Sequence, residues 1–336
     1  MRPTIILLRS ATTLLVTLVA LLCVTFTLSQ LTPVDPALRL VGEHASAAAY
    51  EQARHSLGLD LSWPQRLGRY GKGLLEGDLG VSLSTGQPVE QDLRRVFPAT
   101  LELASLSMLL SALLGITLAI LSTRYPDGWL DALVRVLSLI GNSLPMFWLG
   151  LLALFVFYAQ LQWAGGPGRL DDAYEYTISM PTGLVLVDAW RSGLPGAIAS
   201  AVSHLELPVL LLGLYSLGNV TRLLRAALLG ESRKEYTLLA RATGAGRTRV
   251  LLSHMLPNTA GLLITVLALT YTNLLEGAVL VETVFARPGI GRYLTTALFA
   301  ADIPAILGST LVIGTCFVII NGAADAFARL LDPRST

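Results

Sequence analysis

Long uncharged runs dominate this chain and predict its architecture. The stretches without Asp, Glu, Lys or Arg are residues 10–34, 103–123, 136–168, 250–275 and 303–324. Each reaches the roughly 20 apolar residues that a helix needs to cross a ~30 Å hydrocarbon core. A further apolar stretch at 204–221, whose boundaries are the least distinct, brings the predicted number of membrane spans to about six.

The runs favour helices over a β-barrel. They are continuously apolar instead of alternating, and a helix satisfies all its backbone hydrogen bonds within one segment. The predicted fold class is therefore an all-α integral membrane protein.

The first run is predicted to be a retained membrane helix. Arg2 and Arg9 precede it, as they would precede a secretory signal peptide. However, the run is long and leads into Ser29-Gln30-Leu31 without a small-x-small cleavage site. The cleaved signal peptide is the alternative.

Charge distribution predicts the orientation. Of the 24 Lys and Arg residues, 13 lie in the two termini, the 124–135 connection and the 222–249 stretch, whereas the short loops 164–203 and 282–302 carry four. By the positive-inside rule, both termini and the 222–258 loop are cytoplasmic. The net charge of +1 does not indicate any particular partner, and nucleic acid is not expected.

Two regions are expected along the chain. Residues 1–97 form an N-terminal membrane helix followed by a sizeable extracytoplasmic segment, in which Ser62 begins a helix. Residues 98–336 form a five-helix core that contains the cytoplasmic loop, and the second span opens at Phe97-Pro98.

Two spans carry special residues. Ser107, Ser111, Gly115 and Ala119 form a small-residue stripe that favours close helix packing inside the bundle, with a subunit interface or pore lining as alternatives. The third span contains Asn142 and Pro145. Because proline breaks a helix, and broken helices in transporters often line the substrate route, both a structural and a translocation role stay open.

Most catalytic classes are excluded. The ionisable residues placed near membrane depth are His204, Glu206, His254 and Glu276, and no zinc-protease, serine-hydrolase or paired-aspartate motif is present. Neither of the two lysines stands in the Gly-Lys-Ser/Thr sequence that a nucleotide-binding loop requires. If ATP drives this protein, another chain hydrolyses it. An ion-coupled secondary transporter is a further alternative, with one deep carboxylate in its favour. The two cysteines indicate neither a disulfide nor a metal framework.

The densest basic cluster surrounds a glycine turn. A helix is expected to begin near Glu231 and to present Leu238, Leu239 and Ala242 on one face. After a turn at Gly244 and Gly246, a second short helix presents Leu251 and Met255, and Pro257 begins the fifth span. Composition alone does not separate docking onto anionic lipid from docking onto a protein.

This segment resembles the "EAA" loop of binding-protein-dependent ABC transporter permeases. That pattern places a glycine thirteen positions before the proline of Leu-Pro, as Gly244 and Leu256-Pro257 do here. Its glutamate and two alanines fall on Leu238, Leu239 and Ala240, so that part is degenerate.

The segment is more similar to the dipeptide/oligopeptide subfamily. The residues that carry the match are Glu235, Tyr236, Ala240, Arg241, Ala242, Gly244, Val250, His254, Leu256 and Asn258. Thr243 stands where lysine is usual. "GDLGVS" (77–82) and "VETVFARPGIGRYL" (281–294) resemble further signatures of the subfamily, and "RVFPATLELA" (95–104) is similar to a Sap-type branch linked to peptides and polyamines.

The resemblance implies a mechanism and partners. The chain would pair with a second permease subunit above two ATPase subunits that bind ATP and Mg²⁺, and an extracytoplasmic binding protein would deliver peptides for import across the bacterial inner membrane. Polyamine or cationic-peptide transport, including export, is the alternative. The residues expected at the ATPase contact are Glu235, Tyr236, Leu238, Leu239, Ala240, Arg241, Ala242, Gly244, Gly246, Val250, Leu251, His254 and Pro257. Leu238, Leu239 and Leu251 would insert, and arginines would rim the contact.

Glu276, Asn142 and Pro145 are candidates for the translocation path. A carboxylate at membrane depth is costly and usually faces a cavity or a partner. Glu276 would therefore form an ion pair, lie at interface level near the helix end, or attract a cationic substrate group. Arg287 stands where the family often has tryptophan and is open to a role at the outer mouth or in contact with the binding protein. Glu282 and Asp302 are expected to be solvated at the outer ends of two spans.

Overall fold

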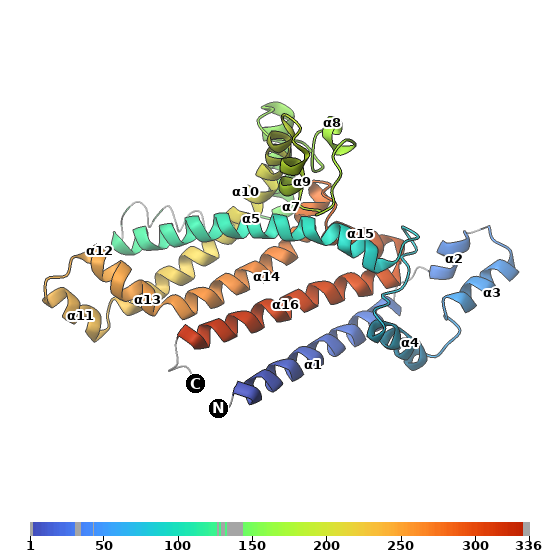
Figure 1. Ribbon diagram of the computed structural model, residues 1–336, viewed down its shortest axis with the longest axis horizontal. Coiled ribbons are helices and arrows are strands. Elements are labelled where there is room, and N and C mark those ends of the chain that lie inside the picture. Colours follow the sequence, from blue (N-terminus) through green and yellow to red (C-terminus); the bar gives the residue numbers. More distant parts are fainter. Residues whose placement is uncertain are drawn as a thin grey trace. The chain divides into compact units, whose positions relative to one another are not determined.

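The computed structural model describes residues 3–30, 35–42, 44–125, 128, 132 and 144–331. Helices and turns make up nearly all of this part of the chain, with an isolated β-bridge between Val81 and Pro88 (Figure 1). The all-α fold class is confirmed.

Seventeen elements follow one another along the described residues. The N-terminal part contains α1 (Pro3–Gln30), α2 (Pro36–Val41), α3 (Ala47–Ser56), α4 (Trp63–Leu75) and α5 (Val89–Arg124). The middle contains α7 (Met146–Ala153), the π-helix η1 (Leu154–Gln160), α8 (Asp172–Glu175), α9 (Val185–Ser192) and α10 (Ala197–Glu231). The C-terminal part contains α11 (Glu235–Ala242), α12 (Arg247–Val250), the π-helix η2 (Leu251–Met255), α13 (Leu256–Asn258), α14 (Ala260–Val284), α15 (Ile290–Ala300) and α16 (Ile303–Leu331).

Five helices of the described residues are long and apolar enough to cross a membrane, namely α1, α5, α10, α14 and α16. They include the fourth predicted span, which forms the 35-residue α10. The first part of the third predicted span, with Asn142, lies outside the described residues. Its remainder is the shorter apolar helix Met146–Gln160, which begins directly after Pro145. The count of six therefore stays a prediction.

Two compact units divide the chain. Unit 1 consists of Met1–Pro98 and Pro288–Val318, and unit 2 consists of Ala99–Arg287 and Ile319–Thr336. The helix that contains the second span begins earlier than the expected opening at Phe97-Pro98, because α5 already starts at Val89. Glu90 and Asp92 in its first turn suit the positive end of a helix dipole, and Pro98 lies inside the helix.

In unit 1, the N-terminal part of α5 packs against α15 and the start of α16. Val89, Leu93, Ile290, Ala297 and Ile306 form a buried cluster there. The Asp302 carboxylate is fully buried and accepts hydrogen bonds from the Ser82 hydroxyl at 2.6 Å and the Ser84 N–H at 2.9 Å. The expectation that Asp302 is solvated is thus wrong: its charge is satisfied by the loop that precedes α5.

In unit 2, the small-residue stripe of α5 packs against α10. Ser107, Ser111 and Ala119 are fully buried, and a Cβ added at Gly115 would meet Val220 at 2.8 Å. Close approach of the two helices explains why small residues recur at four-residue steps. The prediction of packing inside the chain is confirmed.

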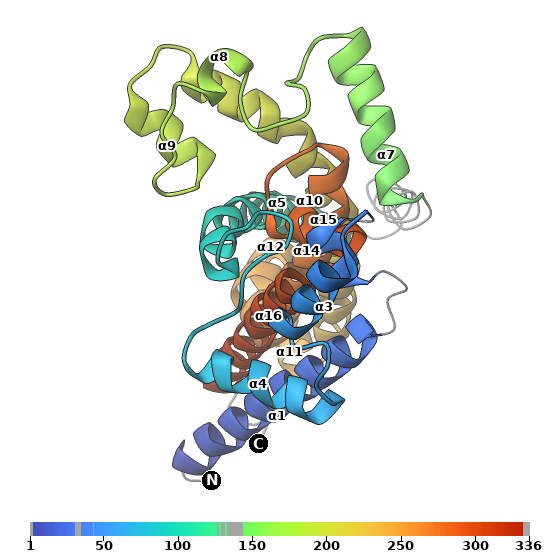
Figure 2. The ribbon, with the colours of Figure 1, turned by 90° about the vertical axis from the view of Figure 1, so that its right-hand side faces the viewer.

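The helix α10 joins two parts of unit 2 that carry polar groups. α8 and α9 precede its first residue, and α11 follows its last (Figures 1 and 2). At 1.5 Å per residue, a 35-residue helix spans roughly 50 Å.

Candidate functional site

The segment 231–258, called here the coupling segment, forms a helix-turn-helix after α10. The expected start near Glu231 is wrong, because α10 continues to Glu231 and α11 begins at Glu235. Arg222 and Arg225, expected in a loop, are therefore part of α10.

The end of α10 holds α11 through Glu231. The Glu231 carboxylate accepts hydrogen bonds from the Tyr236 hydroxyl and, at 2.6 Å, from the Lys234 ammonium. The buried Thr237 hydroxyl donates to the Glu231 carbonyl at 2.8 Å. Burial, and then the hydrogen bond to Glu231, raise the pKa of Tyr236, so its hydroxyl remains a donor at neutral pH. These bonds attach the start of α11 to the end of α10.

Gly244 ends α11 in a defined geometry. Its N–H donates to the Arg241 carbonyl at 3.0 Å, and the Ala245 N–H donates to the Ala240 carbonyl at 3.0 Å. This pair of bonds is a Schellman motif, which needs a left-handed residue. Gly244 has φ 91° with nothing within 4 Å of an added Cβ, so glycine is favoured by the backbone and not by crowding.

The second half of the coupling segment is anchored in unit 2. Val250, Leu251 and Met255 are buried in one cluster with Leu224 and Leu228 of α10, and with Ala119 of α5. The π-helix η2 precedes Leu256-Pro257. Because a proline removes an N–H and its ring crowds the carbonyl four residues earlier, a wider turn relieves that contact.

This anchoring corrects one prediction. Leu251 is only 3% exposed within this chain, so it does not insert into a partner. Leu238 and Leu239 are 53% and 66% exposed, as an inserting pair requires. Leu251 and Met255 were expected at i and i+4 on one face, and that face packs inwards.

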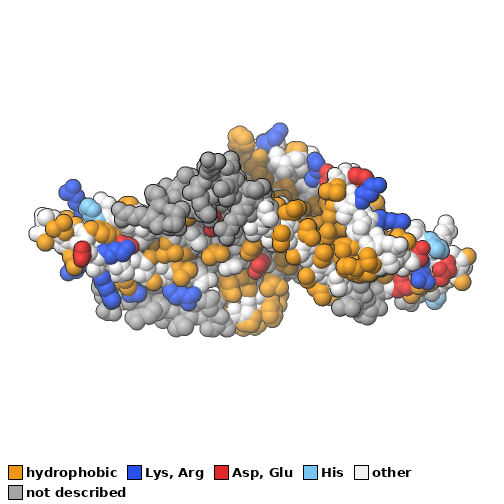
Figure 3. Space-filling view, turned by 90° about the horizontal axis from the view of Figure 1, so that it is seen from below, with side chains coloured by type: hydrophobic (Ala, Val, Ile, Leu, Met, Phe, Trp, Pro, Cys, Tyr) orange, Lys and Arg blue, Asp and Glu red, His pale blue; other side chains and the backbone are white. Residues whose placement is uncertain are grey.

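Residues from both halves of the segment line a shallow hollow of about 500 Å³. Its lining includes Tyr236, Leu239, Ala240 and Gly244 from the first half and His254 from the second. Arg241, Arg247 and Arg249 are exposed around it, and basic and hydrophobic side chains are interspersed at this end of the space-filling view (Figure 3, left). The surface is thus an apolar patch with a basic rim.

The remaining predicted contact residues fall into two groups. Exposed ones are Glu235, Ala242, Gly246 and Pro257; Val250 is buried. Asn258 donates to the His254 carbonyl at 2.6 Å, which places His254 at the junction with α14.

Glu276 and Pro145 line a second hollow, of about 510 Å³, in unit 2. Its polar lining residues are Tyr215, Ser216, Asn219, Thr270, Asn273 and Glu276, contributed by α10 and α14. No described residue forms an ion pair with the Glu276 carboxylate, which is exposed to the hollow. Two of the three candidates for the translocation path therefore meet in one place, and Asn142 lies outside the described residues.

A buried charge cluster lies at the other end of α10. The Glu102 carboxylate, on α5, accepts the N–H groups of Val185 and Leu186 at 3.0 and 2.9 Å and so caps α9. It lies 4.0 Å from Arg169 and 3.9 Å from Arg287. The second carboxylate of the cluster is that of Glu282, which accepts a hydrogen bond from the Thr100 hydroxyl.

The cluster changes the interpretation of two residues. Arg287 is 1% exposed, so it does not form the outer mouth, and burial, with the neighbouring Arg169, lowers its pKa to about 10. Glu282 is also 1% exposed, so the expectation that it is solvated is wrong. The sequence signal was available: Glu102 stands immediately before an uncharged run, and Arg287 departs from the family pattern.

Comparison with known proteins adds the family. The model described as "Binding-protein-dependent transport system inner membrane component" matches residues 112–336, and the model of the N-terminal part of such membrane components matches residues 4–104. The chain belongs to this family. It is accordingly a multi-pass component of an inner membrane.

Relatives named as transport permeases match this chain over nearly its whole length. The chain is 44% identical over 321 residues to the "Probable D,D-dipeptide transport system permease protein DdpB" of Escherichia coli (strain K12), covering 95% of this chain and 94% of the relative. It is 38% identical to the "Dipeptide transport system permease protein DppB" of Haemophilus influenzae, covering 95% of each chain. It is 36% identical to the "Di/tripeptide transport system permease protein DppB" of Pseudomonas aeruginosa, covering 92% of each chain.

Proposed function

We propose that this chain is a permease subunit of an ATP-driven importer of dipeptides or short oligopeptides. The names of the relatives support this substrate class, and the family supports delivery by a binding protein. Hydrolysis of ATP, with Mg²⁺, takes place on two partner ATPase subunits, and a second permease subunit completes the membrane path.

One observation carries the proposed coupling: an exposed pair of leucines on a helix whose two ends are fixed. Leu238 and Leu239 are exposed on α11, Glu231 binds one end of α11, and the Gly244 motif defines the other. In this account the pair enters a groove of an ATPase subunit, with His254, Tyr236 and the arginines around it. Movement of the ATPase pushes α11, and α10 follows because it is bonded to α11. Differential contact with two states of the ATPase is what such coupling requires.

The orientation belongs to the same proposal. Both termini and the coupling segment are cytoplasmic, and α8, α9 and the 35–88 segment are extracytoplasmic. The excess of Lys and Arg in the cytoplasmic parts supports this arrangement.

The hollow at Glu276 supports a substrate with a cationic group. At neutral pH every dipeptide carries an ammonium group at its amino end, and polyamines and basic peptides carry more. A carboxylate between spanning helices that no described residue neutralises attracts such groups where a neutral residue would not.

Two substitutions in the coupling segment test the proposal. Gly244→Asp forces a side chain into a left-handed backbone, and Ala240→Glu places a charge in the hollow between the two halves. We expect both variants to assemble in part with the other subunits and to lose peptide uptake while ATP hydrolysis continues. Gly71→Asp is the matched control, because Gly71 lies on α4, outside the coupling segment, with nothing within 4 Å of an added Cβ. Full uptake by both test variants would contradict the proposed coupling.

A further inference from the structure

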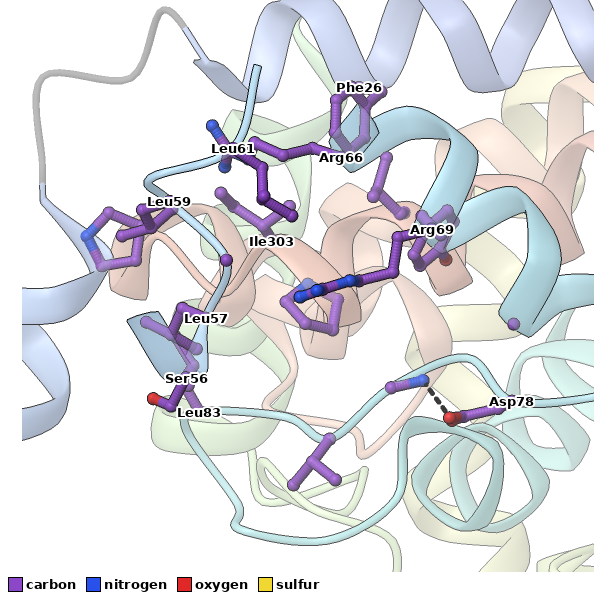
Figure 4. Close-up of a pocket in the computed structure, with 18 residues that line it drawn as sticks. Phe26, Ser56, Leu57, Leu59, Leu61, Arg66, Arg69, Asp78, Leu83 and Ile303 are labelled. Carbon is purple, nitrogen blue, oxygen red and sulfur yellow. Dashed lines mark hydrogen bonds between the residues drawn. The ribbon is translucent and has the colours of Figure 1, made fainter. Parts of the chain in front are cut away.

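A pocket in unit 1 lies between α1, α4, the start of α16 and the loops that flank α4. Its volume is about 360 Å³, within the range of about 300 to 1,000 Å³ of small-molecule sites. Its apolar wall includes Phe26, Leu57, Leu61 and Leu307. Figure 4 shows the side chain of Arg69 extended across the middle of this space.

The polar groups of the pocket favour an anion. The charged residues of its lining are two arginines, Arg66 and Arg69, and one carboxylate, Asp78. One oxygen of Asp78 accepts a hydrogen bond from the Gly80 N–H at 2.7 Å. The hydroxyl of Tyr70 is buried and has no hydrogen-bond partner in the described part of the chain. Burial raises the pKa of Tyr70, which keeps this hydroxyl protonated as a donor. A buried donor without an acceptor is costly, so a bound acceptor would stabilise it.

The position of the pocket favours a lipid. Phe26 lies near the end of the apolar span Thr12–Ser29 of α1, and Ile303 and Leu307 lie in the first turns of α16. These two helices contact each other where Gly314 meets Leu21. The pocket therefore lies at the level where two spans end, which is the boundary between hydrocarbon and water.

The helix α4 has the character of an interfacial helix. It carries Arg66, Arg69 and Lys72 and no acidic residue, while Trp63 and Leu75 are exposed. Its first residue packs edge-on against Phe26, with ring centroids 6.2 Å apart, which fixes α4 to α1. Basic amphipathic helices with such residues lie in the interface and attract anionic lipids.

We propose that this pocket binds the anionic head of a phospholipid. The phosphodiester lies against Arg69 and Arg66 and accepts the Tyr70 hydroxyl, and the adjoining chain follows the apolar wall toward Leu307. The two arginines of the lining outnumber its one carboxylate, which suits a ligand with a negative charge such as a phosphodiester. The predominance of apolar wall favours a lipid over free phosphate, which has no apolar part to bury.

Native mass spectrometry of the delipidated full chain tests this site. Phosphatidylglycerol and phosphatidylcholine with the same acyl chains are titrated separately. We expect preferential retention of phosphatidylglycerol, weakened about tenfold or more by Arg69→Gln and likewise by Tyr70→Phe, as the loss of one hydrogen bond to a charged group predicts. Tyr70→Phe removes only the unpartnered hydroxyl and preserves the packing of the ring.

Arg54→Gln is the matched control, because Arg54 is a basic residue of α3 outside the pocket. We expect it to bind phosphatidylglycerol like the unsubstituted chain. Equal affinity for both lipids, or undiminished affinity in Arg69→Gln, would overturn the proposal. Displacement of the lipid by excess inorganic phosphate would assign the pocket to a free anion. Loss of the binding protein from Arg69→Gln, with lipid binding unchanged, would assign it to a protein contact, and both results would equally overturn the proposal.

Discussion

Glu276 is the residue whose surroundings most directly concern substrate. Its carboxylate faces a hollow that also presents Asn219, Asn273 and Tyr215, and within the described residues no cation neutralises it. A charge held between apolar helices is expensive unless it is hydrated or meets a cation. The hollow supplies polar groups, and a passing ammonium group would supply the cation.

We predict that Glu276→Gln lowers uptake of cationic substrates about tenfold while uptake of peptides with a blocked amino end changes little. The expected size corresponds to one charge-assisted interaction of about 1.4 kcal/mol. Uptake of radiolabelled substrates by cells that carry the variant is the measurement. Glu206→Gln, an exposed carboxylate elsewhere on α10, is the control. Equal loss for charged and blocked substrates would refute an electrostatic role for Glu276.

The Glu102 carboxylate lies near two buried arginines, Arg169 and Arg287, and also caps α9. Removal of one member of a buried charge cluster leaves the other charges uncompensated, which costs about 3 to 5 kcal/mol. The distances of 3.9 and 4.0 Å to the arginines are long, so the lower end of that range applies.

We therefore predict that Glu102→Gln destabilises the folded chain by about 3 kcal/mol. Thermal unfolding of the purified chain in mild detergent, followed by tryptophan fluorescence, measures the loss as a lower Tm. Glu206→Gln should retain the unsubstituted Tm. The cluster would have no role in stability if both variants unfolded at the same temperature.

At the scale of elements, α11 and η2 have opposite roles in one segment. The exposed pair Leu238 and Leu239 is free for a partner, whereas Leu251 fills a cluster beneath α10. The same type of side chain is thus exposed, as the proposed docking requires, in one element and buried as an anchor in the other.

We predict that Leu239→Ser weakens binding of the ATPase subunits and leaves the Tm of the chain unchanged. Leu251→Ser should lower the Tm, because truncation of a buried leucine costs about 2 to 5 kcal/mol. Thermal unfolding of both variants, together with the amount of ATPase that co-purifies, makes the comparison. A large loss of Tm in Leu239→Ser would show that this side chain supports the fold instead of a contact.

The sequence predicted the spans and the turn at Gly244 because both depend on local signals. Uncharged runs specify spanning helices, and a glycine that must be left-handed specifies where α11 ends. The start of α5 was misplaced because Pro98 looked like a boundary, whereas a helix can begin earlier when its first turn carries acidic residues.

The partners of individual side chains were harder to predict. Their positions in the sequence suggested that Glu282 and Asp302 are solvated. Both carboxylates are instead buried, and they accept hydrogen bonds from hydroxyl and N–H groups of distant segments. Leu238, Leu239 and Leu251 are the same residue type in one segment. Only the packing of Leu251 against α5 and α10 makes it buried while the other two are exposed. Such contacts join residues far apart in the sequence, so no local periodicity in the sequence indicates them.

At the scale of the molecule, α10 connects a charged cluster to a docking surface. Arg287 donates to the His204 carbonyl at 3.4 Å near the start of α10, and Glu231 holds α11 at its end. In the proposed mechanism, a displacement of α11 is carried along α10 between these attachments, and α10 also borders the hollow at Glu276. This continuity is the physical basis of the proposed coupling of ATP hydrolysis to transport.

Co-purification is the most direct test of that account. The chain is tagged in its native membrane, solubilised gently and examined by mass spectrometry, with Leu239→Asp prepared in parallel. We predict that the unsubstituted chain retains a second permease-like subunit and nucleotide-binding ATPases, and that Leu239→Asp retains the permease partner but loses the ATPases. Recovery of the unsubstituted chain without any ATPase, or full retention of the ATPases by Leu239→Asp, would contradict the account.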